Sequence, residues 1–181
     1  MSKKNFWNDA SRAGAIVGLI SIALTMAGML IPKAAFVLGL VSFVITIYLL
    51  FHYTRRRSLL YMEEGFSYSQ SLGFIAAIGL FAGIISGAYQ IVASNFLFTE
   101  TYEQQIEDSI ALLSQSGLYS SEMMEQMSDM MRTYTLSPLP TLLSNIASCV
   151  LSFCFYGLFI SIGTKREADI FDNNDEEQDE E

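Results

Sequence analysis

The sequence has few of the residues that most often build catalytic and metal sites. It contains one histidine and two cysteines among 181 residues. It has no Ser/His/Asp set, no glycine-rich phosphate loop and no spacing of metal ligands, and it lacks the basic stripe with which many proteins bind nucleic acid. We therefore expect a non-enzymatic protein with no catalytic residue, no cofactor, no metal site and no nucleic-acid partner.

The two cysteines are not spaced for a disulfide with each other. Cys149 and Cys154 lie in one apolar run, and side chains five residues apart on a helix point about 140° away from each other. Two free thiols among apolar neighbours are expected.

Charged residues are absent from four long apolar stretches. A helix of about 20 residues, at about 1.5 Å each, crosses a hydrocarbon core of about 30 Å, and each stretch is at least about that long. The sequence therefore predicts an all-α integral membrane protein whose four transmembrane helices form a bundle, within a membrane domain of residues 1–163. The expected spans are residues 13–31, 34–53, 72–96 and 139–162.

The acids behind the formal net charge of -9 gather in two places. Residues 99–137, between the third and fourth spans, hold seven acids and one arginine, and their apolar spacing predicts two amphipathic helices in an extracytoplasmic hairpin. Residues 164–181 are predicted to be a disordered cytoplasmic tail, because their acids repel one another.

Five methionines in the second hairpin helix have two interpretations. Thioether sulfur is a soft ligand that can hold Cu(I), whereas methionine is also an adaptable apolar filler. Since no histidine or cysteine lies in this segment, packing is the preferred interpretation. The residues are Met123, Met124, Met127, Met130 and Met131.

The distribution of basic residues predicts the orientation in the membrane. Eight of the ten lysines and arginines lie in the N-terminal segment, in the connection between the second and third spans, and after the fourth span. The opposite connections hold only Lys33 and Arg132. Basic residues accumulate on the cytoplasmic side, so we expect both termini in the cytoplasm and the protein in the inner (plasma) membrane of a bacterium.

Three consecutive arginines, Arg55, Arg56 and Arg57, follow the second span. They are an ordinary orientation signal, and they are also placed to contact the head groups of anionic lipids.

Glycines recur at intervals of four in two spans. Gly79, Gly83 and Gly87 lie along one side of the third helix, and Gly14 and Gly18 along one side of the first. Lipid gives helices no hydrophobic reason to associate, and glycine lets two backbones approach closely. These residues are predicted to pack against another helix, either of this chain or of a second copy.

No ionisable residue is expected deep within a span, which argues against proton-coupled or ion-coupled transport. Gln90 and Asn145 are amides near the outer ends of the third and fourth spans. We expect them to hydrogen-bond between helices. If they lined a pathway instead, the protein would be a small oligomeric transporter or channel.

Two motifs carry a resemblance to a known family. They are Tyr53-Thr54-Arg55-Arg56-Arg57, and the lead-in Gly65-Phe66-Ser67-Tyr68-Ser69-Gln70-Ser71 before the glycine-bearing third span. With the early tryptophan and the glycines of the first span, they make the chain resemble the bacterial membrane proteins grouped as the domain of unknown function 4199 family. The resemblance implies a four-span inner-membrane protein with a variable outer segment, and it implies no activity.

The sequence thus favours a non-enzymatic membrane protein that acts in helix packing, protein interaction or assembly. Its expected partners are the lipid bilayer and either a second copy or another membrane protein. The alternative is the transporter or channel described above, and binding of a metal by the outer methionines is a further one.

Overall fold

The computed structural model describes residues 5–61, 65–115, 117 and 119–165, and six α-helices make up most of them. Four helices are long and apolar enough to cross a membrane, which confirms the predicted all-α membrane architecture. The helices are α1 (Phe6–Leu30), α2 (Ala35–Ser58), α3 (Tyr68–Val92), α4 (Thr99–Gln115), α5 (Ser121–Leu136) and α6 (Pro138–Thr164).

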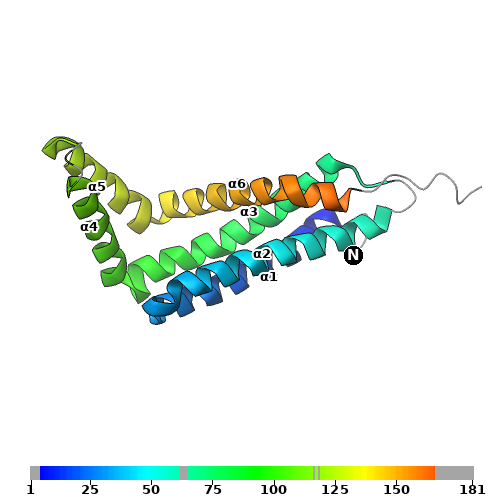
Figure 1. Cartoon of the computed structure of the whole chain (residues 1–181), viewed down its shortest axis with the longest axis horizontal. Coiled ribbons are helices and arrows are strands. Elements are labelled where there is room, and N and C mark those ends of the chain that lie inside the picture. Colours follow the sequence, from blue (N-terminus) through cyan, green and yellow to red (C-terminus); the bar gives the residue numbers. More distant parts are fainter. Residues whose placement is uncertain (1–4, 62–64, 116, 118, 166–181) are drawn as a thin grey trace, which may run out of the picture.

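The four long helices run lengthwise side by side, and α4 and α5 form a hairpin across one end of them (Figure 1). We call this the hairpin end. The opposite end, where α1 begins and α6 finishes, is the terminal end. The predicted tail lies outside the described residues, except for its first two residues, Thr164 and Lys165.

All four long helices extend beyond the stretches expected to cross the membrane, and α1 and α2 do so by the most. The first begins at Phe6, before the expected start at Ala13, and α2 continues to Ser58, past the expected end at Tyr53. Both extensions lie at the terminal end, and they bring the charged residues that flank the spans into regular helix.

The polar lead-in to the third span is a helix start. Ser67 is the N-cap of α3, and its hydroxyl accepts a hydrogen bond from the backbone N–H of Gln70 at 3.2 Å. The Gln70 side chain accepts from the backbone N–H of Ser67 at 3.0 Å, which completes a capping box. Gly65 precedes it with a φ of 79°, a conformation that favours glycine.

The other connections follow from local sequence in the same way. Only Ile31 and a turn of 3₁₀ helix at Pro32–Ala34 join α1 to α2, so these two helices form a tight antiparallel pair. Ser137 precedes Pro138, the first residue of α6, where the missing N–H costs the helix no hydrogen bond.

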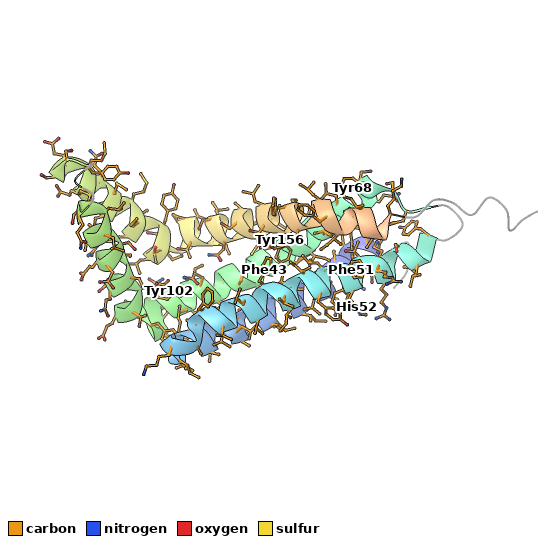
Figure 2. The ribbon with its side chains drawn as sticks, viewed as in Figure 1. Phe43, Phe51, His52, Tyr68, Tyr102 and Tyr156 are labelled. Atoms are coloured by element: carbon orange, nitrogen blue, oxygen red, sulfur yellow. The ribbon has the colours of Figure 1, made fainter. Side chains whose placement is uncertain are left out.

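The hairpin is attached to α3 and α6 by buried polar contacts. A π-helical turn at Ala93–Leu97 ends α3, and the Tyr102 hydroxyl of α4 donates to Gln90 Oε1 at 3.3 Å (Figure 2). Burial raises the pKa of the Tyr102 phenol above its ordinary value, so this hydroxyl stays protonated and able to donate. At the other junction, Thr141 Oγ1 of α6 donates to the carbonyl of Tyr134 at 2.8 Å.

The core of the bundle is built around α3. Phe74, Ile75 and Ile78 are fully buried, and they belong to one apolar cluster with residues of α1 and α6. By contrast, the buried residues of α2 are confined to its last third, Leu50 to Ser58. The rest of α2 exposes large apolar side chains such as Phe36 and Val44, as expected of a helix that faces lipid.

Candidate functional site

The glycine ladder of α3 packs against α6 of the same chain. A Cβ built on Gly83 would lie 2.7 Å from Ile146 Cα, and one on Gly79 would lie 3.2 Å from the carbonyl oxygen of Cys149. At Gly87 the nearest atom is Leu142 Cδ1, at 2.9 Å. Any side chain at Gly83 would therefore collide with the backbone of the neighbouring helix.

The glycines of α1 make a second close approach, to a different side of α3. A Cβ on Gly14 would lie 2.6 Å from Phe81 Cβ, and one on Gly18 would lie 3.3 Å from the carbonyl oxygen of Ala82. The sequence left open whether the glycines meet another helix of this chain or a second copy, and in the fold they meet other helices of this chain. Both glycine faces are filled within one chain.

A buried ion pair joins α1 to α2 at the terminal end. Arg57 Nη1 lies 2.9 Å from Asp9 Oδ2, and the two side chains are only 2% and 7% exposed. A buried charge is costly without a partner, so each of these groups depends on the other for its place in the fold.

Aromatic rings surround the Arg57 guanidinium. Its central carbon lies 5.0 Å from the ring centres of both Phe6 and Phe74, and 5.9 Å from that of Tyr61. Nη2 also donates to the Tyr61 hydroxyl at 3.3 Å. Since Phe74 belongs to α3, this cation–π contact ties the α1–α2 pair to the central helix.

The position of Arg57 corrects one expectation from the sequence. A side chain that is 2% exposed is not available to lipid head groups, so this predicted role is wrong for Arg57. Its neighbours Arg55 and Arg56 are exposed, and for them lipid contact stays a prediction.

The role of Asp9 was not predicted from the sequence, because Asp9 lies among basic residues that are typical of a segment next to the membrane. A signal was present in the spacing of Asp9, Ala13 and Val17, which places all three on one side of the helix. That side is the one that is buried.

Gln90 and Asn145, two amides near the hairpin end, have structural partners. Gln90 accepts from Tyr102 between two helices, as predicted. Asn145 instead donates from Nδ2 to the Thr141 carbonyl of its own helix at 3.1 Å, so the expected hydrogen bond between helices is wrong for this residue. Neither amide lines a cavity described below, and the alternative of an oligomeric transporter or channel stays a prediction.

The cavities at the terminal end are lined by arginines, whereas those at the hairpin end have no basic side chain, and the largest of them, about 710 Å³ between α5 and α6, is lined by Asp129. At the hairpin end, a cavity of about 510 Å³ between α1, α2 and α4 has no charged side chain in its wall. At the terminal end, one of about 310 Å³ is lined by Arg57 and its aromatic neighbours. Another, of about 230 Å³, is lined by Asp9, Arg12, Ile16, Tyr53 and Arg56.

The methionines of α5 do not share one environment. Met123 and Met130 are exposed, whereas Met124, Met127 and Met131 are half-buried. In the part of the chain that the structure describes, no group of three His, Cys, Asp or Glu side chains is placed to hold a metal ion. This mixed burial fits a helix that uses methionine as apolar filler.

These features define a helical membrane protein with four long apolar helices, packed through glycine and with a buried ion pair between α1 and α2. Residues 12–164 match the family described as Protein of unknown function (DUF4199), and the chain belongs to this family. No curated protein and no solved structure matches the chain. The resemblance noted in the sequence is therefore confirmed, and it brings no known activity with it.

Replacing Gly83 with leucine is expected to destabilise the folded chain. The new side chain would enter the backbone of α6, and overpacking of this kind costs about 1–3 kcal/mol. We expect a clearly lower melting temperature in detergent. Gly73→Leu is the matched control on the same helix, since a Cβ there meets nothing within 4 Å. A Gly83→Leu protein as stable as the control would contradict the packing of α3 on α6.

Replacing Arg57 with methionine is expected to cost about 3–5 kcal/mol, because it leaves the Asp9 carboxylate buried without a partner. The measurement is reversible unfolding in mixed micelles. Removing both charges, as in Asp9→Leu with Arg57→Met, should recover most of the loss. Arg55→Met removes an exposed arginine from the same turn and should change stability little. Equal losses for Arg57→Met and Arg55→Met would show that the ion pair has no structural role.

Proposed function

We propose that the protein is a non-enzymatic component of the bacterial inner membrane that binds another protein through the outer hairpin α4–α5. In this proposal both termini lie in the cytoplasm. The bias of eight basic residues against two supports that orientation. The hairpin then faces the opposite side of the membrane and is the largest part of the chain available there.

The exposed charge of the hairpin is the observation that carries this proposal. All seven of its acids are exposed, and among the described residues only Glu107 has a basic neighbour, Arg132, at 3.9 Å. The acids are Glu100, Glu103, Glu107, Asp108, Glu122, Glu125 and Asp129. An exposed pair at that distance contributes little to stability, so ion pairing within the described residues does not account for these acids.

The apolar side of the hairpin is used for attachment to the bundle. Tyr102 and Ile106 are buried at the base of α4, and Thr141 holds the end of α5. A firmly attached helical pair with an uncompensated charge of one sign is suited to recognise a basic segment of a partner.

The glycines of α1 and α3 already pack against helices of this chain. A partner protein is therefore expected to bind at the hairpin rather than between the membrane-spanning helices. The side of α3 that allows close approach is covered by α6, and α1 covers another side. A second copy of the chain would have to use a different surface, so the proposal does not require a homo-oligomer.

Photo-crosslinking in growing cells tests this function. A crosslinking amino acid at exposed Gln104 of α4 is expected to give a discrete adduct with one partner protein. Neutralising Glu103, Asp108, Glu122 and Glu125 as their amides should reduce the adduct about tenfold, because charge complementarity is lost. A crosslinker at Val44, exposed on α2, controls for random collision in the membrane. An adduct that survives neutralisation, or no discrete adduct from the hairpin, would contradict the proposal.

A further inference from the structure

Two arginines from different helices line one cavity at the terminal end. Arg12 of α1 and Arg56 of α2 line it together with Asp9, Ile16 and Tyr53, around a volume of about 230 Å³. Arg55, although adjacent to Arg56, is not among the lining residues and lies over the ring of Phe51 at 5.9 Å.

The cavity has an excess of positive charge. Arg12 and Arg56 are exposed, and neither makes an ion pair with any described residue. The carboxylate of Asp9 is already balanced by Arg57 at 2.9 Å. Two unpaired guanidinium groups therefore share one small space, where an anion between them would reduce their mutual repulsion.

The chemistry of arginine narrows the kind of anion. The planar guanidinium offers parallel N–H donors that match the oxygens of a phosphate group, and two such groups can grip it from both sides. Tyr53 also lines the cavity, and a tyrosine can offer a neutral hydroxyl donor. The lining is thus suited to a phosphate that carries negative charge.

The surface beside the cavity indicates that this phosphate belongs to a lipid. Ile16 and Leu19 follow Arg12 at intervals of four and three residues, so all three lie on one side of α1. Ile16 is 41% exposed and Leu19 is 59% exposed. An apolar strip thus runs from the cavity along the membrane-spanning part of α1, where an acyl chain can lie.

We propose that this cavity binds the phosphate of an anionic phospholipid, held between Arg12 and Arg56 with an acyl chain along Ile16 and Leu19. With the orientation given under Proposed function, the lipid comes from the cytoplasmic leaflet. This site is separate from the hairpin surface, and its test in detergent does not depend on orientation or on a protein partner.

The test compares lipids on the purified full chain. Native mass spectrometry is used to titrate phosphatidylglycerol and phosphatidylcholine with identical acyl chains. We expect phosphatidylglycerol to bind more tightly to the wild type. The variant Arg12→Gln with Arg56→Gln should weaken that binding at least about tenfold, since each basic residue near a membrane surface contributes about 1 kcal/mol.

A matched control distinguishes the effect of the cavity on lipid binding from the effect of losing two positive charges elsewhere on the protein. Arg55→Gln with Lys33→Gln also removes two positive charges, and neither residue lines the cavity. This control should weaken phosphatidylglycerol binding clearly less than the cavity variant does, because Arg55 and Lys33 can act on the lipid only from outside the cavity. Both variants should keep the melting temperature of the wild type because no described ion pair is broken. Equal weakening by the two variants, or no preference for phosphatidylglycerol, would overturn the proposal.

Inorganic phosphate distinguishes a lipid site from a site for the free anion. In the lipid site, millimolar inorganic phosphate should leave phosphatidylglycerol bound, because it offers no acyl chain to Ile16 and Leu19. If millimolar inorganic phosphate displaced phosphatidylglycerol, the cavity would be a site for free phosphate, and the lipid assignment would be contradicted.

Discussion

Close approach of backbones is the constraint on which the rest of this structure depends. Lipid removes the hydrophobic reason for helices to associate, so they must gain contact by packing closely. Here α3 is the common partner. Its own glycines meet α6, and the glycines of α1 meet another of its sides. The central helix consequently buries more of its surface than any other long helix.

The peripheral helix α2 needs a different attachment. Glycine contributes little to the packing of α2, since a Cβ on Gly39 would meet nothing within 4 Å. Its buried residues instead lie near the Asp9–Arg57 ion pair, where the guanidinium also contacts Phe74 of α3. The desolvation cost of a buried pair makes it weak evidence for overall stability, but a pair that fits only one neighbour fixes how α2 sits on the bundle. The same pair neutralises Asp9, which leaves Arg12 and Arg56 as the net charge of the neighbouring cavity.

Much of the fold follows from local sequence. The uncharged stretches and the cap formed by Ser67 and Gln70 can be recognised without coordinates, because they depend on hydropathy and short-range hydrogen bonds. The partner of each glycine face was not readable. An apolar helix in lipid has no polar side to show which of its faces is buried. The glycines of α3 could pack equally well against a helix of this chain or of another chain.

The candidate site was harder to predict for a related reason. Arg57 belongs to a run of three arginines that reads as surface charge, and only its helical spacing from Leu50 and Thr54 distinguishes the buried member. Asp9 is 48 residues away in sequence. Nothing local connects the two, so their pairing required the arrangement of α1 and α2.

The most direct test of the account asks whether α3 and α6 of one chain meet. Ser86 Oγ lies 3.7 Å from Cys149 Sγ across this contact. With Cys154 replaced by serine, the variant Ser86→Cys should form a disulfide with Cys149 under a membrane-permeable oxidant. The account predicts a protein of monomeric mass that has lost both free thiols. A disulfide-linked dimer, or two thiols that stay free, would contradict it.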